Sequence, residues 1–273
     1  MHEPGRECLG HSFAQPLAAG NGSYAQLAHG DCDTLLLLVH GFGGSAVSTW
    51  RGLRSLAAGT PETASADIVS YGYNSTNAPA ANSAVLLGEF MDGIIRNSPE
   101  WSNLVEQVTG HGRPRDYQRI IIVAHSLGAA VSRRMLLNAI DAGDDWPAQA
   151  RLLLFAPAHM GTRLLADRAL LGGGLGGLVN TLLTGWKLGR PALDDLLPDS
   201  DFLKSLISDT ETQLGNGWGD TLKAKQIVFG ELESVVKVAR FCDDPPHKVW
   251  REHTHTSICK AEEAAKFVSE NLA

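Results

Sequence analysis

Residues 120–130 read Ile-Ile-Ile-Val-Ala-His-Ser-Leu-Gly-Ala-Ala. The first four are branched and apolar, which is typical of a strand buried on both faces. The strand runs without a linker into a turn of small residues, and a helix follows. A strand that reverses into a helix so abruptly strains its central residue and pushes that side chain out at the carboxyl edge of the sheet. The stretch therefore predicts that Ser126 is presented at such a turn.

Small residues flank this serine, with Ala124 two positions before it and Gly128 two positions after it. The segment resembles the nucleophile elbow of the α/β-hydrolase family, with alanine where the first glycine is commoner. The resemblance implies that Ser126 is the nucleophile and that the N–H of Leu127 is one oxyanion donor. An ordinary strand-to-helix turn of another α/β protein is the alternative.

A second apolar run, Thr34–Val39, predicts a central parallel strand and leads into His-Gly-Phe-Gly-Gly-Ser at residues 40–45. In the same family a His-Gly-x segment supplies the second oxyanion donor, and the resemblance gives this role to the N–H of Phe42. Glycines let a backbone N–H come close to the oxyanion. A phosphate-binding loop is disfavoured, because neither common glycine spacing is present. We expect His40 to form structural hydrogen bonds.

Composition favours one large α/β domain with an insertion: 273 residues, 44% hydrophobic and 19% charged. The net charge of −7 and the absence of a basic patch argue against a nucleic-acid partner. The four cysteines are scattered without metal-ligand spacing, which favours reduced thiols and a cytoplasmic location. Residues 1–21 lack a signal-like apolar run. We expect them to form a flexible tail before a domain over 22–273.

Strand and helix patterns alternate along the chain, which indicates a mainly parallel sheet with helices on both faces. Further strands are expected at Ala66–Tyr73 and Arg151–Ala156. A helix capped by Ser83 should follow the first of these, with Leu86, Phe90 and Ile94 on its buried face. The connection from Trp101 to Tyr117 has little pattern. After Ser126, the helix should bury Val131, Met135, Leu136 and Ile140 and leave Arg133 and Arg134 in solvent.

The alternation stops between about Arg163 and Leu222. Within this region Leu170–Leu183 is apolar and glycine-rich but too short for confident membrane insertion. Lids of the family are inserted after the sixth strand, so we expect a lid or cap, which could also contact a membrane surface. A helical pair that packs on the core without gating is the alternative. Asp199–Leu206 also resembles a helix of lipase-like esterases.

The acid of a Ser-His-acid triad should precede the histidine in this family. Gln226–Phe229 predicts a late strand, and Gly-Glu-Leu-Glu-Ser-Val-Val at 230–236 resembles the Gly-x-x-Asp-x-Val-Val loop of the family, with Glu233 in place of the aspartate. The resemblance makes Glu233 the acid that orients the histidine. The alternatives are Glu231, Asp243 and Asp244, the earlier Asp194 or Asp195, or a loop carboxylate in solvent.

The base should lie in a late loop, after a strand near Lys248–Arg251. Residues 253–260 resemble the His-x-x-Ile-Cys-Lys-Pro segment of a group of serine esterases, with alanine where proline is usual. His255 fits that register, whereas His253 fits a surface or supporting position. A closing helix should bury Ala264, Phe267, Val268 and Leu272. The loop at 157–162 resembles a Pro-His-x-Gly-Ser loop with one extra alanine, which leaves His159 without a role.

The family resemblance implies a serine hydrolase of carboxylic esters that uses Ser126, His255 and Glu233. We expect no metal and no organic cofactor, and a small acyl ester or a lipid as substrate. Thioester or amide cleavage by the same triad, a non-catalytic ligand-binding protein and a membrane-surface interaction protein are the alternatives. The oligomeric state is left open.

Overall fold

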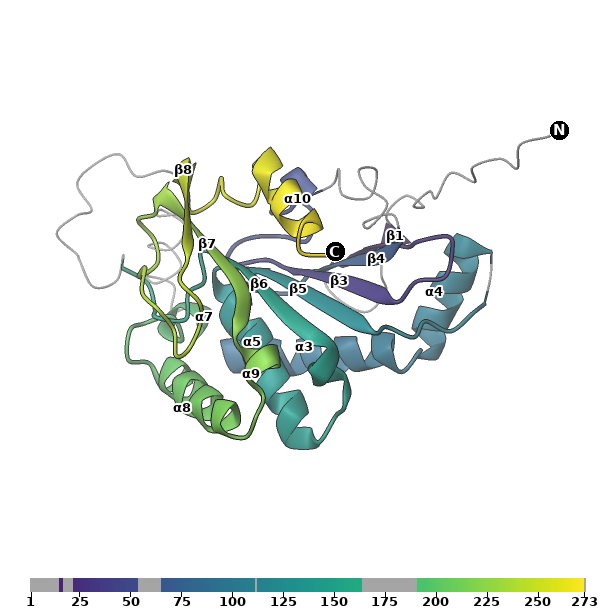
Figure 1. Cartoon of the computed structure of the whole chain (residues 1–273), viewed down its shortest axis with the longest axis horizontal. Helices are drawn as coiled ribbons and strands as arrows, with labels where there is room; N and C mark the ends of the chain where they lie inside the picture. Colours follow the sequence, from purple (N-terminus) through teal and green to yellow (C-terminus); the bar gives the residue numbers. More distant parts are fainter. Residues whose placement is uncertain (1–14, 17–21, 54–64, 111, 164–190, 273) are drawn as a thin grey trace.

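The strand that leads to Ser126 lies near the middle of a twisted sheet (Figure 1). The computed structural model describes residues 15–16, 22–53, 65–110, 112–163 and 191–272. Within these ranges the sheet has eight strands in the order β1-β2-β4-β3-β5-β6-β7-β8, and all six from β4 to β8 in this order are parallel. Their bounds are β1 (Gln15–Pro16), β2 (Tyr24–Gln26), β3 (Thr34–Val39), β4 (Ala66–Tyr71), β5 (Arg119–His125), β6 (Ala150–Phe155), β7 (Ala224–Leu232) and β8 (Lys248–Thr254).

Helices cover both faces of this sheet (Figure 1). One face packs against α3 (Ala80–Ile95) and α5 (Leu127–Ala142), and the other against α10 (Glu262–Ser269) and the 3₁₀ turn η1 (Arg51–Leu53). The remaining elements are α4 (Pro99–Thr109), η2 (Trp146–Gln149), α7 (Pro191–Asp194), α8 (Asp201–Gly215) and α9 (Gly219–Leu222). Because all six parallel strands end at one edge, the loops that follow them gather there.

Alternate residues of the central strands enter two separate cores, as the two-residue period of a strand requires. In β3 and β5 the first core receives Leu35, Leu37, Ile120 and Ile122, and the second receives Leu36, Leu38, Ile121 and Val123. Both sets are buried, and the residues in the middle of each strand are therefore apolar on both faces. This double burial is the physical reason for the continuous apolar runs in the sequence.

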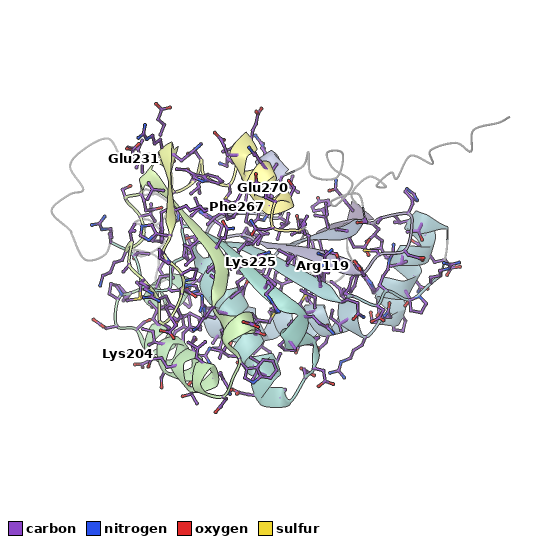
Figure 2. The ribbon with its side chains drawn as sticks, viewed as in Figure 1. Arg119, Lys204, Lys225, Glu231, Phe267 and Glu270 are labelled. Atoms are coloured by element: carbon purple, nitrogen blue, oxygen red, sulfur yellow. The ribbon has the colours of Figure 1, made fainter. Side chains whose placement is uncertain are left out.

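The end of the chain is attached to the amino ends of two strands. Arg119 donates a hydrogen bond to the carbonyl oxygen of Leu272 at 2.7 Å, and Lys225 donates to that of Asn271 at 3.3 Å. Figure 2 shows both side chains, with Phe267 of α10 nearby. Phe267 packs in the second core, as predicted, together with Ala264, Val268 and Leu272.

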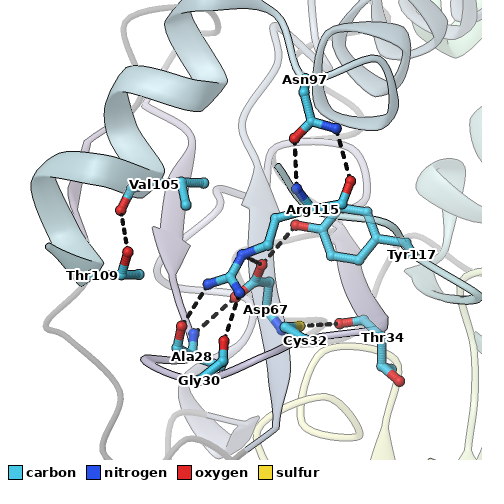
Figure 3. A network of polar contacts seen from close by, with 10 residues as sticks. All are labelled: Ala28, Gly30, Cys32, Thr34, Asp67, Asn97, Val105, Thr109, Arg115 and Tyr117. Carbon is cyan, nitrogen blue, oxygen red and sulfur yellow. Dashed lines mark hydrogen bonds and ion pairs between the residues drawn. The ribbon is translucent and has the colours of Figure 1, made fainter. Parts of the chain in front are cut away.

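A buried polar network, shown in Figure 3, lies near the amino ends of β4 and β5, whereas Ser126 follows the carboxyl end of β5. The Asp67 carboxylate forms a 3.0 Å ion pair with Arg115 and accepts hydrogen bonds from the Tyr117 hydroxyl and the Ala28 N–H. Arg115 also donates to the carbonyl oxygens of Ala28 and Gly30. The buried charges are tolerated because they are paired and hydrogen-bonded. Since the partners come from different segments, the network joins β4 to the segments before β3 and β5.

The predicted cap of α3 was wrong, and its predicted buried face was only partly right. The helix begins at Ala80, whose N–H donates to the carboxylate of Asp195 at 2.6 Å, so its capping group comes from 115 positions later in the chain. Ser83 lies inside the helix and is buried. The apolar face is shifted, because Leu87 and Met91 are buried whereas Leu86 is 52% exposed; Ile94 is buried as predicted.

Two further expectations need correction. The connection expected to lack pattern contains α4, which Ser98 caps by accepting a hydrogen bond from the Trp101 N–H. On α5 the predicted apolar face is buried, but Arg133 is only 1% exposed, because it pairs with a buried carboxylate from a distant loop. Its neighbour Arg134 is half-buried and pairs with Asp209.

The expected lid falls partly outside the described residues, since these exclude 164–190 and with them Leu170–Leu183. The rest of that region forms α7, α8 and α9. Phe202, Leu203 and Leu206 of α8 are buried in the first core. This described part therefore packs on the domain.

Candidate active site

Ser126 lies between β5 and α5 with φ of 53° and ψ of −121°. This left-handed region is costly for a residue with a side chain, and the surrounding structure must hold it there. The Ser126 N–H donates to the carbonyl oxygen of Phe155 at 3.1 Å, and its own carbonyl accepts from Ala129 and Ala158. The strain predicted for the turn is therefore present, and hydrogen bonds to neighbouring segments maintain it.

Two glycines let the loop after β3 approach this turn. A Cβ atom on Gly41 would lie 2.7 Å from the Cβ of Ser126, and one on Gly128 would lie 2.4 Å from the carbonyl oxygen of His40. Both distances are too short for any side chain. The contact places Phe42, which follows Gly41, in the wall of the pocket beside Ser126. Leu127 begins α5, where a backbone N–H has no partner within the helix.

His255 connects the serine to a carboxylate. Its Nε2 lies 2.9 Å from the Ser126 Oγ, and its Nδ1 lies 2.8 Å from Oε2 of Glu233. All three side chains are buried, and they come from the carboxyl end of β5, the loop after β7 and the loop after β8. The tertiary structure thus brings Ser126 together with Glu233 and His255, both of which lie more than 100 positions later in the sequence.

Glu233 is held as an anion. Its Oε1 accepts hydrogen bonds from the N–H groups of Val235 and Val236, at 2.7 and 3.0 Å. Burial acts to raise the pKa of Glu233, but the hydrogen bond and charge of His255 and the two backbone donors outweigh it, and the pKa lies below its ordinary value. Because the carboxylate can only accept, the proton at this contact is on Nδ1 of His255, and Nε2 faces the serine as an acceptor.

The other candidate acids have different partners. Glu231 accepts from the Glu252 N–H, and Asp195 caps α3. Asp243 pairs with Lys223 and Asp244 with Arg133. Asp194 is exposed. Among the described residues, Glu233 is the carboxylate that contacts His255.

The remaining histidines of interest pack in different ways. His253 is half-buried beside Trp250 and Ser257. His40 stacks on Tyr73 and contacts the Gly41 carbonyl oxygen through Nδ1 at 2.9 Å, as expected of a structural residue. Burial lowers the pKa of His40 to about 4. His159 is fully buried, with its ring 4.5 Å from that of Phe241.

A pocket of about 230 Å³ opens over Ser126 and His255. Its wall includes residues that the sequence did not single out: Ser48, Thr49, His125, Thr162, Leu196, Val235 and Lys260. His125 is notable, because its Nε2 lies 2.8 Å from the carbonyl oxygen of His255. Its position immediately before the serine was the one available signal. The others line the pocket only because their loops converge at this edge of the sheet.

The sequence profile of the alpha/beta hydrolase family matches residues 36–264, which is most of the chain. The chain therefore belongs to the alpha/beta hydrolase family, and the predicted fold is confirmed. A comparison with curated protein sequences found no match. Membership of this family and the structural neighbours that follow support a hydrolase.

Solved structures of similar fold include the mature lipase BlEst2 of Bacillus licheniformis, with a TM-score of 0.53 at 15% identity over 96% of this chain and 97% of that one. The 2-hydroxy-6-oxo-6-phenylhexa-2,4-dienoate hydrolase of Rhodococcus sp. strain RHA1 has a TM-score of 0.54 at 12% identity, covering 96% and 98%. An esterase of Pyrococcus furiosus has 0.52 at 13%, covering 97% and 90%. At these identities the similarity establishes the fold.

In the described part of the chain, no helix is both long and apolar enough to cross a bilayer. Membrane contact through Leu170–Leu183 concerns residues outside that part. This contact and the cytoplasmic location stay predictions.

Proposed function

We propose that this protein is a serine hydrolase that cleaves carboxylic esters through an acyl-enzyme. The observation that carries the proposal is the continuous chain of hydrogen bonds from Glu233 through His255 to Ser126. A serine hydroxyl is a weak nucleophile unless a base takes its proton, and the base needs a fixed tautomer and orientation. These two contacts satisfy both requirements.

In the first half of the reaction, Oγ of Ser126 attacks the ester carbonyl carbon as Nε2 of His255 takes the hydroxyl proton. The imidazolium that forms is stabilised by Glu233, which stays ionised because of its two backbone donors. His255 then gives the proton to the oxygen of the leaving alcohol. The C–O bond breaks, and the acyl group remains on Ser126.

The N–H groups of Phe42 and Leu127 are assigned to the oxyanion hole. Support comes from the contact between Gly41 and Ser126 and from the position of Leu127 at the start of α5. Such donors act on charge that develops in the tetrahedral intermediate. In the second half, His255 removes a proton from water as the water attacks the acyl carbon. The bond between that carbon and Oγ of Ser126 then breaks, His255 returns the proton to Oγ, and the acid is released.

The pocket volume favours short acyl groups. Pockets for drug-sized ligands typically enclose about 300–1,000 Å³, and the cavity over Ser126 is smaller, at about 230 Å³. Lipase and esterase are the names of two of the structural neighbours, which agrees with ester chemistry. Thioesters and amides pass through the same tetrahedral intermediate, and nothing in the site favours them over esters.

The test combines fluorophosphonate labelling with hydrolysis of p-nitrophenyl esters of two to sixteen carbons, on the wild type, Ser126→Ala and His255→Ala. We expect labelling of the wild type at Ser126, loss of turnover in both variants, and highest kcat/KM for the short esters. A folded wild type that neither labels nor cleaves any ester would refute the enzyme and favour a ligand-binding protein. Cleavage of matched thioesters or amides at higher kcat/KM would replace the ester assignment.

A further inference from the structure

His125 occupies the position between β5 and the catalytic turn. It is the last residue of the strand, and its side chain is 7% exposed and forms part of the pocket wall. Successive side chains of a strand point to opposite faces of the sheet, so the residue that precedes Ser126 could point away from the site. Instead it reaches the loop that carries His255.

The contact between the two histidines determines the tautomer of His125. Nε2 lies 2.8 Å from the main-chain carbonyl oxygen of His255, and a carbonyl oxygen can only accept. Nε2 therefore carries the proton and donates. Nδ1 lies against the loop after β3, since a Cβ on Gly41 would be 3.1 Å from it. One imidazole thus touches both the backbone of the base and the segment assigned to the oxyanion hole.

The ring of His125 also packs against the ring of His255. Their centroids are 4.7 Å apart, and the planes are inclined by 47°. Glu233 and Ser126 hold the two nitrogens of His255, whereas His125 holds its main chain and one face of its ring. Without His125, the described hydrogen bonds leave the main-chain carbonyl of His255 without a donor, and the imidazole is held only through its two ring nitrogens.

Resting on the proposed function, we propose that His125 is a positioning residue: its Nε2–H, bound to the carbonyl of His255, fixes the loop that presents the catalytic imidazole to Ser126. A displacement of about 1 Å between reacting groups can lower a rate by about 100-fold. The single hydrogen bond from His125 to the carbonyl oxygen of His255 can therefore have a large effect on kcat while contributing little to substrate binding.

The surroundings keep this donor neutral. The groups that face His125 are cationic when charged: His255 beside it, His40 from the loop after β3 and Lys260 from the segment before α10. Burial, followed by the charge of His255, lowers the pKa of His125 well below its ordinary value. A neutral His125 adds no positive charge next to the imidazolium that forms on His255 during acylation.

Three variants separate positioning from general structural support. In His125→Gln the amide nitrogen can occupy the place of Nε2, whereas in His125→Asn the same amide is too short, and His125→Phe keeps the ring but has no donor. We expect kcat to fall by about 10- to 100-fold in the Asn and Phe variants, with KM nearly unchanged. The Gln variant should recover most of the activity, and the acid limb of its kcat/KM profile should match that of the wild type.

Wild-type turnover in the same assay tests the proposed function separately. Given an active wild type, equal kcat in folded Asn and Phe variants would overturn the positioning role, as would a Gln variant no better than Asn. A measurement without activity completes the test: ¹⁵N NMR of the histidine rings, with the His125 signals assigned from their absence in His125→Gln. We expect the Nε2–H tautomer at pH 7, and an Nδ1–H tautomer would refute the proposal.

Discussion

Arg133 and Asp244 form an ion pair inside the protein, with Nη2 and Oδ2 2.7 Å apart and both side chains buried. Arg133 also donates to the Leu222 carbonyl oxygen, and Asp244 accepts from the Ala224 N–H. The guanidinium lies 4.5 Å from the centre of the Phe241 ring. The pair therefore ties α5, which begins beside Ser126, to the segment that follows Glu233.

Removing one partner of this pair should be costly. Asp244→Asn leaves the Arg133 charge buried without its counter-ion, and we expect a loss of about 3–5 kcal/mol in the free energy of unfolding. Asp209→Asn is the matched control, because Asp209 pairs with Arg134 at 2.6 Å but is 43% exposed, and its loss should be about 0–1 kcal/mol. Urea denaturation measures both, and equal losses would contradict the importance of burial.

Gly128→Ala should damage the site by a steric mechanism. A Cβ at this position would meet the carbonyl oxygens of His40 and Val39 at 2.4 and 2.5 Å, so β3 and α5 must separate. We expect a loss of about 1–3 kcal/mol in stability and reduced labelling of Ser126 by fluorophosphonate.

The control for that substitution is Gly88→Ala in α3. The new methyl group would meet only Cγ of Met135, at an ordinary 3.8 Å. Alanine is a better helix former than glycine, so the variant should be about 0.5–1 kcal/mol more stable and fully active. The midpoints of thermal unfolding of the two variants should shift in opposite directions. A stable, active Gly128→Ala would refute the close approach of α5 to the end of β3.

The length of Glu233 matters because each carboxylate oxygen has its own partner. In Glu233→Asp the shorter side chain cannot reach His255 and also accept from both Val235 and Val236, so we expect an intermediate loss of kcat. Glu233→Gln keeps the shape but cannot stabilise the imidazolium, and kcat should fall by about 10³- to 10⁴-fold. Steady-state kinetics ranks the variants. If the Gln variant keeps wild-type kcat, the assignment of the acid is wrong.

His159 makes the protein less stable in acid. Burial, and then the nearby Arg133 charge, lower the pKa of His159 well below its ordinary value. Below about pH 6.5 the unfolded chain therefore binds a proton at this histidine, whereas the folded chain does not. The free energy of unfolding then decreases as the pH is lowered. In His159→Leu the loss of stability between pH 6.5 and 5 should be shallower, with a difference in slope that approaches about 1.4 kcal/mol per pH unit at the acid end of this range. The exposed His29→Leu serves as the control and should keep the wild-type slope.

Local pattern was sufficient for the central strands and for the turn at Ser126. β3, β5 and β6 are apolar at nearly every position because both faces are buried, and this signal is independent of distant residues. The elbow residues were likewise recognisable because their constraints are steric and local. The closing helix showed its buried side by periodicity alone.

Distant partners account for the errors. Ser83 was expected to cap α3, but the cap is Asp195, and no local rule can supply a residue 115 positions away. A charged side chain on a helix usually lies in solvent, and the burial of Arg133 depends on its ion pair with Asp244 and its hydrogen bond to the Leu222 carbonyl oxygen. The role proposed for His125 has no signature in the sequence, because its partner is a main-chain carbonyl.

The sequence by itself indicated the family, the strained serine and the order of the proposed nucleophile, acid and base, because these depend on residue types at short spacing. Only the tertiary structure decided which carboxylate meets His255 and which groups hold it in place. Those relationships depend on distances of about 3 Å between loops from different strands, and such distances exist only once the parallel strands are aligned at one edge of the sheet.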